Sequence, residues 1–283
     1  MIQILARLER TSSDLIAASR LMRNPITAFS FLRSGMACRR LGLGTFRTGP
    51  LTFVARKEDW SGVREIFIKG EYEILDTLLK DIEAPLVLDL GANIGGFALR
   101  AFRRWPKATV ISVEAAPDTF EILERNRRLN ENLDWRVVQA GIWKSDCELV
   151  LDRRNISIGH RVAEGQEGER IRSLTLSSLL NDVGWQDIDL IKMDIEGAEA
   201  EVVPTVPDVL ARTSILIIEV HTDRIDPVDT YRTLADVFSH CWQLNDRASN
   251  KPVFVLSNTS LQLAGAIPIG LRSLAQETNA SPV

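Results

Sequence analysis

The stretch that decides the fold runs from Val87 to Phe97 and reads VLDLGANIGGF. Its first residues form a short apolar run, which is typical of a buried strand. The run leads into a turn in which Gly91 and Gly95 permit backbone conformations that other residues rarely adopt. A strand that enters such a turn and then a helix usually holds a nucleotide there. The unusual feature is Asp89, because a carboxylate two residues before the first glycine would repel a phosphate.

Apolar runs of strand length alternate with helical segments from about residue 70 onward. We expect strands at 87–90, 109–113, 135–140, 189–193, 215–220 and 253–256, and helices at 95–105, 117–130, 175–182, 198–203 and 228–240. Pro204 and Pro207 should disturb the fourth of these helices. Alternation of this kind predicts an α/β fold with a doubly wound, mainly parallel sheet and helices on both faces. Residues 144–173 are polar, contain three glycines and break the rhythm, which predicts an insertion or hairpin.

The N-terminal segment has a different pattern. Residues 1–40 read as helix, and Asn24-Pro25 should divide it in two, because Asn is a good N-cap and Pro fits the first helical position. A seven-residue apolar repeat in this segment predicts a stripe that packs on the core; it consists of Leu8, Leu15, Met22, Phe29 and Met36, with Leu5, Ile26 and Leu32 beside them. Residues 45–69 should form short strands around a Gly49-Pro50 turn. We therefore divide the chain into an N-terminal extension (1–69), a main domain (70–260) and a C-terminal tail (261–283).

Charge is unevenly distributed. Residues 1–57 contain ten Arg or Lys and two acidic residues, so they carry +8 and leave −12 for the remainder of a chain with net charge −4. This basic segment is either a solvated helical face or a surface for an anionic partner, such as a membrane. The three cysteines form no CxxC pair, which favours a reducing cytoplasm. No apolar run reaches the roughly 18 residues that span a bilayer, and the N-terminus does not resemble a secretory signal.

The acidic residues at the first two strand ends indicate the cofactor. A dinucleotide would place its pyrophosphate at the helix that follows Gly95, close to Asp89, and the spacing of the glycines does not fit GxGxxG. S-adenosylmethionine (SAM) suits an acid better, because it carries an ammonium and a sulfonium and no phosphate. Glu114 closes the next strand, where a carboxylate can accept hydrogen bonds from both ribose hydroxyls. NAD-binding folds use the same device, so Glu114 alone does not discriminate.

A second polar group follows the later strands. Asp194 and Glu196 lie at one strand exit, and Glu219 and His221 end the next. All should meet the glycine turn at the same sheet edge. His221, Asp194 and Glu196 are candidates for the base that accepts a proton from a hydroxyl. Asp194, Glu219 and His221 could instead bind a divalent metal. We expect Lys192 and Glu199 to form a structural ion pair.

Five segments together resemble the FkbM family of SAM-dependent methyltransferases: VLDLGANIGGFALRA, ISVEAAPDTFEILERNRRLN, VVQAGIW, IDLIKMDIEGAEAEVV and ILIIEVH. They lie within residues 70–222, and KMDIEGAE is the most specific of them. The resemblance implies a class I (Rossmann-like) methyltransferase fold and O-methylation of sugars in glycans and glycolipids, or of polyketide-type metabolites. It also implies cofactor contacts at Asp89, Gly91, Ala92, Asn93, Gly95, Glu114, Ala115, Ala140 and Gly141, with Ala140-Gly141 beside the adenine, and an acceptor that faces Asp194, Glu196 and His221.

The function predicted from the sequence is therefore a cytoplasmic SAM-dependent O-methyltransferase that acts on a small-molecule or glycan hydroxyl. Three alternatives stay open. A nicotinamide-dependent oxidoreductase is disfavoured by Asp89 and the missing GxGxxG. An RNA or protein methyltransferase is disfavoured by the acidic body and by Asp194-Ile-Glu-Gly, where many base N-methyltransferases have an Asn/Asp-Pro-Pro-aromatic signature. A non-catalytic SAM-binding module would keep the same fold.

Overall fold

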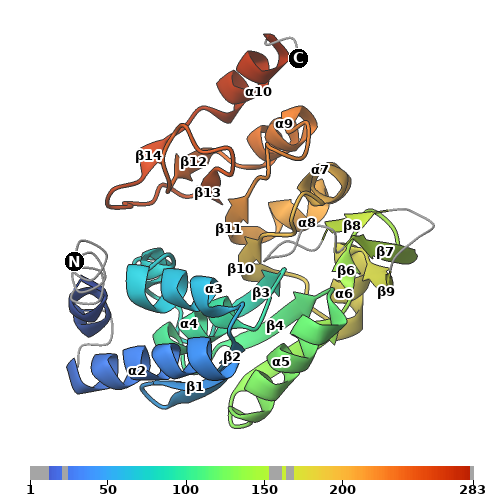
Figure 1. The fold of residues 1–283 in the computed structure, drawn as a ribbon. Coiled ribbons are helices and arrows are strands. Elements are labelled where there is room, and N and C mark those ends of the chain that lie inside the picture. The colour runs from blue at the N-terminus through green and yellow to red at the C-terminus, as the bar shows by residue number, and fades with distance from the viewer. Residues whose placement is uncertain (1–12, 21–24, 153–160, 164–168, 281–283) are drawn as a thin grey trace.

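The computed structural model describes residues 13–20, 25–152, 161–163 and 169–280. Its centre is an eight-stranded sheet (Figure 1). Along the sheet the strands are β14 (Ile267–Pro268), β12 (His240–Gln243), β13 (Val253–Ser257), β11 (Thr213–Glu219), β10 (Ile188–Met193), β3 (Leu86–Leu90), β4 (Thr109–Glu114) and β5 (Asp134–Gln139). The strands from β11 to β5 run parallel, whereas β13 is antiparallel to β11. The predicted mainly parallel α/β sheet is confirmed.

The connections wind in opposite directions from the middle of the sheet. The chain moves outward from β3 through β4 to β5, and later returns to the other side of β3 as β10 and β11. The carboxyl ends of β3 and β10 therefore flank the topological switch point, where open α/β sheets bind their ligands. The connecting helices are α4 (Gly96–Arg104), α5 (Pro117–Arg128), α6 (Leu176–Val183), α7 (Glu199–Val202), α8 (Pro207–Ala211) and α9 (Val228–Val237).

Alternate strand residues feed two hydrophobic cores, as expected for a sheet covered on both faces. Leu88 and Leu90 belong to one core, together with residues of α6 to α9. Val87 belongs to the other, which includes residues of α4 and of the N-terminal segment. Asp89 shares the face of Val87, so its carboxylate lies on the side that the N-terminal segment covers.

Several predicted boundaries are corrected by the structure. Residues 60–69 are helical, as α3 (Trp60–Arg64) and a π-helical turn (Glu65–Lys69), because this segment turns back from the hairpin toward the sheet. The helix expected to reach His240 ends at Val237, and His240 begins β12. The sequence did not predict β14 or α10 (Leu271–Ala280), which packs on α9. Pro204 and Pro207 do interrupt the helix after Ala198: a 3₁₀ turn (Val203–Thr205) separates α7 from α8.

The insertion between β5 and α6 forms a small sheet of its own. Its order is β6-β9-β7-β8, with β6 (Gly141–Ile142), β7 (Glu148–Asp152), β8 (Arg161–Ala163) and β9 (Glu169–Leu174). β7 pairs antiparallel with both β8 and β9, so the predicted hairpin is confirmed. The predictions on residues 1–12, 21–24 and 153–160 lie outside the described residues.

The N-terminal segment is a helix and a hairpin. α2 (Pro25–Leu41) begins at the proline that was expected to start it, and β1 (Leu43–Thr48) and β2 (Leu51–Arg56) flank the predicted turn. The predicted inner stripe is wrong for three residues of α2, because Ile26, Phe29 and Met36 are exposed, whereas its member Leu32 is buried as predicted. The rest of the buried face consists of Ala28, Phe31 and Cys38. The chain division at residue 69 stays a prediction.

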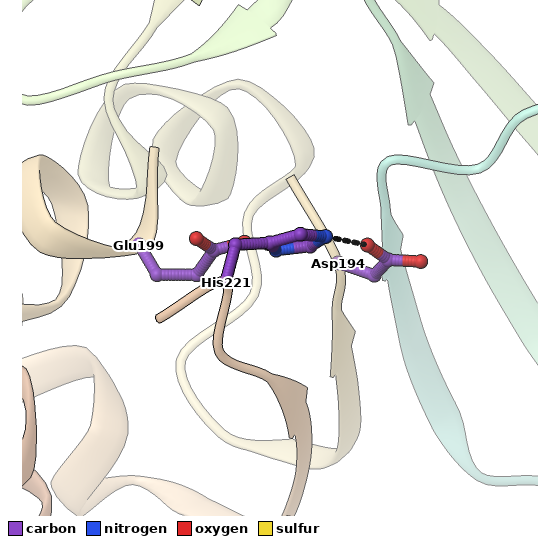
Figure 2. A group of neighbouring side chains, drawn as sticks. All are labelled: Asp194, Glu199 and His221. Carbon is purple, nitrogen blue, oxygen red and sulfur yellow. Dashed lines mark hydrogen bonds and ion pairs between the residues drawn. The ribbon is translucent and has the colours of Figure 1, made fainter. Parts of the chain in front are cut away.

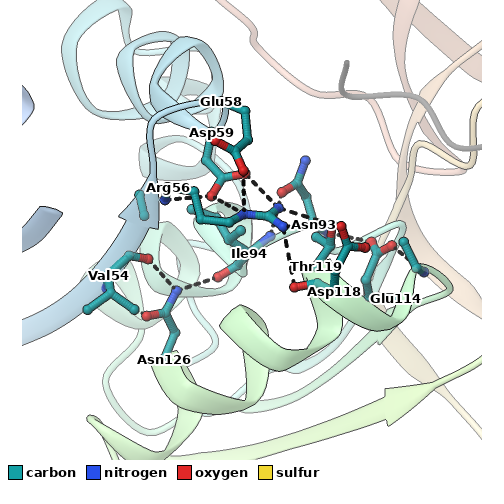
Figure 3. A network of polar contacts seen from close by, with 12 residues as sticks. Val54, Arg56, Glu58, Asp59, Asn93, Ile94, Glu114, Asp118, Thr119 and Asn126 are labelled. Carbon is teal, nitrogen blue, oxygen red and sulfur yellow. Dashed lines mark hydrogen bonds and ion pairs between the residues drawn. The ribbon is translucent and has the colours of Figure 1, made fainter. Parts of the chain in front are cut away.

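Two asparagine side chains, Asn126 on α5 and Asn130 just after it, fasten the hairpin to this helix. Figure 3 shows the first of them. Asn126 accepts a hydrogen bond from Val54 N at 2.7 Å and donates to Val54 O at 3.0 Å. Asn130 makes the same pair of bonds with Thr52, one helical turn further on. The amides thus pair with alternate residues of β2 as a neighbouring strand would. Asn126 also donates to Ile94 O at 2.8 Å, which links the hairpin to the glycine turn.

Within the described part of the chain, none of the helices is both long and apolar enough to cross a membrane.

We expect Asn126→Ala to lower the free energy of unfolding by about 3 kcal/mol, because it leaves buried backbone groups of Val54 and Ile94 without partners. Urea denaturation of the full chain measures this. Asn132→Ala, at an exposed position of the loop after α5, is the matched control and should change stability by no more than about 0.5 kcal/mol. Equal effects of the two substitutions would show that Asn126 does not anchor the hairpin.

Candidate functional site

The glycine turn lies against the segment that follows β10. Asp89 on β3 is the register partner of Lys192 on β10, so the two strands leave the sheet side by side. Gly91 has a φ of 73°, and a Cβ at this position would lie 1.7 Å from the carbonyl oxygen of Asp194. Any other residue would separate the two strand exits. Gly91 therefore serves to bring the cofactor turn and Asp194 together.

The other glycines of the turn make room for protein side chains. A Cβ at Gly95 would lie 2.6 Å from Trp135, and a Cβ at Gly96 would lie 2.5 Å from Ile66. The first residues of α4, Gly96 and Phe97, are buried. The helix N-terminus is thus covered by β5 on one side and by the N-terminal segment on the other. A pyrophosphate needs that terminus open.

Glu114 ends β4 directly beside the turn. One carboxylate oxygen accepts a hydrogen bond from Asn93 N at 2.8 Å, and the other accepts from Ala116 N at 2.9 Å. Burial raises the pKa of Glu114, and these two backbone hydrogen bonds act in the opposite direction. Asn93 holds a φ of 50° and accepts a hydrogen bond from Ile94 N. Each oxygen of Glu114 keeps a further lone pair, so the residue can still accept two hydroxyl groups.

Asp89 is fully buried below the turn and does not reach its surface. One oxygen accepts a hydrogen bond from Ser112, which in turn accepts one from the indole of Trp135. The other oxygen lies 3.6 Å from the ammonium of Lys192 and has no hydrogen-bond partner among the described residues. The charge of Asp89 is therefore offset by the buried ammonium of Lys192. A contact between Asp89 and a cofactor stays a prediction.

Lys192 is buried and connects the two strand exits. Its ammonium donates to Gly91 O at 2.7 Å and to Leu90 O at 3.3 Å, and lies 3.7 Å from Asp194. Burial acts to lower the pKa of Lys192, but attraction to Asp194 and Asp89 outweighs it and raises the pKa. The predicted pair with Glu199 is wrong. Lys192 points toward the glycine turn, whereas Glu199 lies next to His221.

His221 follows β11 and lies between carboxylates on both sides (Figure 2). Its Nδ1 is 3.1 Å from Glu199 and its Nε2 is 3.1 Å from Glu196. Asp194 is 3.7 Å from Nε2. Burial acts to lower the pKa of His221, but the hydrogen bonds to Glu196 and Glu199 outweigh it and raise the pKa to about 10. With both nitrogens protonated, the ring cannot accept a proton in this arrangement.

The remaining acids differ in how firmly they are held. Glu196 has a φ of 57° and accepts a hydrogen bond from Arg224 at 2.7 Å. Glu219 lies 3.9 Å from His221 Nε2, and burial together with Asp194 raises its pKa to about 7. Asp194 is the most exposed of the three, with 28% of its side chain accessible, and neither of its oxygens accepts a hydrogen bond from a described residue. Asp194 and Glu219 are thus the two carboxylates of this group that accept no hydrogen bond from a described residue, and Asp194 is the more exposed of them.

The same groups could hold a metal, and ligand atoms of Asp194, Glu199 and His221 lie within 4.8 Å of one another. Glu199 and Asp194 nevertheless flank different ring nitrogens (Figure 2). A single ion bound at Nε2 would leave Glu199 to orient the ring through Nδ1 rather than to bind the ion. The metal set expected from the sequence (Asp194, Glu219, His221) stays a prediction.

The structure places the predicted polar residues at one sheet edge. Ala92 and Ala140 are buried and Ala115 is partly buried beside Glu114; Ala140 N donates to Glu114 O at 3.1 Å, and Gly141 follows as the start of β6. Sequence reasoning missed Glu71, whose charge interacts with Asp194 and Lys192, and Arg224, which holds Glu196. Neither lies in a segment with a recognisable pattern, so no signal in the sequence could have found them.

An open doubly wound sheet with a glycine turn and acidic strand ends at its switch point defines a Rossmann-like domain of the class I methyltransferase type. The family described as the methyltransferase FkbM domain matches residues 89–241, which is more than half of the chain. This chain belongs to the FkbM family and is a methyltransferase.

Individual relatives are more distant. The chain is 28% identical over 179 residues to methyltransferase sdnD of Sordaria araneosa, covering 51% of this chain and 68% of sdnD. It is 27% identical over 176 residues to the hexuronic acid methyltransferase AglP of Haloferax volcanii, covering 60% and 70% of the two chains. Among solved structures, methyltransferase FkbM from Methylobacillus flagellatus is 12% identical with a TM-score of 0.47, over 80% of this chain and 58% of that one.

We expect Lys192→Met to lower the free energy of unfolding by about 3 kcal/mol, because it leaves the buried carboxylate of Asp89 without a counter-charge. Combining it with Asp89→Asn should restore part of this loss. Urea denaturation of the single and double variants completes a mutant cycle, and Lys80→Met at an exposed position serves as the control. Additive effects of the two substitutions would show that the pair does not interact.

Proposed function

We propose that this methyltransferase uses SAM and transfers the methyl group to a hydroxyl of a saccharide, a glycolipid or a secondary metabolite. The observation that carries the choice of cofactor is the covered start of α4. Trp135 and Ile66 lie where side chains at positions 95 and 96 would project, so the glycines here serve close packing, while Glu114 keeps acceptor sites for ribose hydroxyls beside the turn. A nucleoside without phosphates suits this arrangement.

The residues fit SAM on three counts. Glu114 would receive the ribose, and Gly91, Ala92, Asn93 and Gly95 would form the turn against which the cofactor lies. Asp89 would act from below the turn, through a carboxylate oxygen that no described residue hydrogen-bonds. Ala115, Ala140 and Gly141 would border the adenine. When bound, SAM supplies an electrophilic methyl group on a sulfonium, which a hydroxyl oxygen can displace in line while its proton passes to a base of the protein.

We assign the role of that base to Asp194. It directly follows β10, and its carbonyl oxygen would lie 1.7 Å from a Cβ at Gly91, so Asp194 adjoins the cofactor turn. Glu196 is held by Arg224 and by His221. His221, with both nitrogens turned to carboxylates, would orient Glu196 and Asp194 and would not accept the proton itself. In this proposal Asp194, Glu196 and His221, the three residues of the predicted acceptor site, would each have a role.

The name of one relative, a hexuronic acid methyltransferase, supports a saccharide acceptor. The acidic surroundings of the site support the same class over nucleic acid, because Asp194, Glu196 and Glu219 would repel a phosphate backbone. A membrane or a glycan would then be the partner of the basic N-terminal segment.

Calorimetric titration with SAM and, separately, with NAD tests the cofactor. We expect SAM to bind at micromolar strength and NAD to give no heat of binding. Glu114→Gln should weaken SAM binding about tenfold, because one acceptor oxygen is replaced by a donor. Glu131→Gln, at an exposed position after α5, is the control. Binding of NAD, or of neither ligand, would reject the proposal.

The acceptor is tested with methyl-labelled SAM and a panel of neutral, amino and acidic glycosides. Label that survives mild alkali marks a methyl ether, whereas a methyl ester releases methanol. We expect a methyl ether, a loss of at least about a hundredfold in kcat for Asp194→Asn with unchanged SAM affinity, and full activity after EDTA. If EDTA abolishes activity and Mg²⁺ or Mn²⁺ restores it, the metal set Asp194, Glu219 and His221 is supported instead.

A further inference from the structure

Helix α2 presents apolar side chains on two opposite sides. The inner side, with Phe31 and Cys38, packs on β1 and forms part of a hydrophobic core. The outer side carries Ile26, Phe29 and Met36, which are 78%, 58% and 59% exposed. Single exposed apolar residues are normal on a protein surface, but three on one helix face indicate a contact surface.

The outer residues form one stripe in which apolar and basic side chains alternate. Ile26, Phe29, Arg33, Met36 and Arg40 follow one another at intervals of three and four residues. At about 100° per residue they fall within an arc of about 80°. We call these five residues the outer stripe. A stripe of this composition fits a surface that is apolar inside and negatively charged outside, because arginine can bury its stem and keep its charge at the boundary.

The charge carried by helix α2 itself has a single sign. The helix contains no acidic residue and has Arg39 and Arg40 in its last turn. None of the ion pairs between described residues involves Arg33, Arg39 or Arg40. Arg20, in the helical residues 13–20, and Arg47 on β1 are exposed as well. Among the described residues, the arginines of α2 thus have no carboxylate partner, which suits contact with an anionic surface.

The body of the protein restricts how such a partner can approach. Residues 58–283 carry a net charge of −12, and an anionic surface repels them. Figure 1 shows α2 at the edge of the molecule, on the far side from α10 and β14. An anionic surface would thus meet the protein at α2 and not at the acidic ends of the strands.

We propose that the outer stripe of α2 docks the protein on the surface of an anionic lipid bilayer. Ile26, Phe29 and Met36 would enter the boundary between headgroups and acyl chains, and Arg33 and Arg40 would contact lipid phosphates. The helix would lie in the plane of the surface, since its inner side remains packed on the hairpin.

Co-sedimentation of the full chain with vesicles tests the proposal. We expect binding to vesicles of equimolar phosphatidylcholine and phosphatidylglycerol, and little binding to phosphatidylcholine alone. The pair Arg33→Gln and Arg40→Gln should weaken binding about thirtyfold, and the pair Phe29→Ser and Met36→Ser should weaken it at least about tenfold. Melting curves establish whether each variant is folded. We expect all of them to fold, because the substituted residues lie on the outside of α2.

Matched controls remove the same groups from the acidic body. Arg136→Gln with Arg247→Gln takes away two exposed charges, and Leu129→Ser takes away an exposed apolar side chain after α5; both should bind vesicles as the wild type does. Failure of the wild type to sediment with anionic vesicles overturns the proposal, as do equal losses in controls and stripe variants. A dimer in light scattering that Phe29→Ser with Met36→Ser dissociates would assign the stripe to self-association and would overturn it too.

Discussion

The ammonium of Lys192 is where β10, β3 and the glycine turn meet. It donates to the carbonyl of Gly91 and lies between the carboxylates of Asp89 and Asp194. A buried cation of this kind is stable only with its partners in place, so it ties the two strands at the switch point to one arrangement. Gly91 completes the tie, because only a residue without a side chain lets the carbonyl of Asp194 come so close. The position of every other group in the site follows from this junction.

The glycine turn has a different use here from the one its composition first indicates. Glycines in nucleotide-binding turns commonly let the backbone approach a phosphate. In this protein they let Trp135, Ile66 and the carbonyl of Asp194 approach the turn. Asp89 is offset by Lys192 and has a smaller effect on a ligand than its bare charge implies, whereas the glycines at the start of α4 are packed against Trp135 and Ile66.

The acidic side chains that follow β10 and β11 differ in how many other groups they bind. Glu199 is buried and holds His221 and Ile195 N, Glu196 is shared by His221 and Arg224, and Asp194 makes no side-chain hydrogen bond to a described residue. Groups that hold others in place contribute rigidity, whereas Asp194 and Glu219 make only ion pairs with described residues. The same principle applies to α2: its inner face is used by the core, and its outer face is available to a partner.

The amino-acid sequence alone was enough to predict the doubly wound sheet, most of its central strands and the sheet edge at which the acidic residues gather. These depend on local features: apolar runs of strand length, a glycine turn, and the rule that parallel strands end on one side. It could not determine which face of α2 is buried, because the helix is apolar on two sides and the choice depends on the aromatic side chains of β1 and β2 that receive it. Nor could it pair Lys192 with Asp89 or His221 with Glu199. Those pairs join residues 103 and 22 positions apart, and only the packing of β10 against β3 and of α7 against the end of β11 brings them within reach.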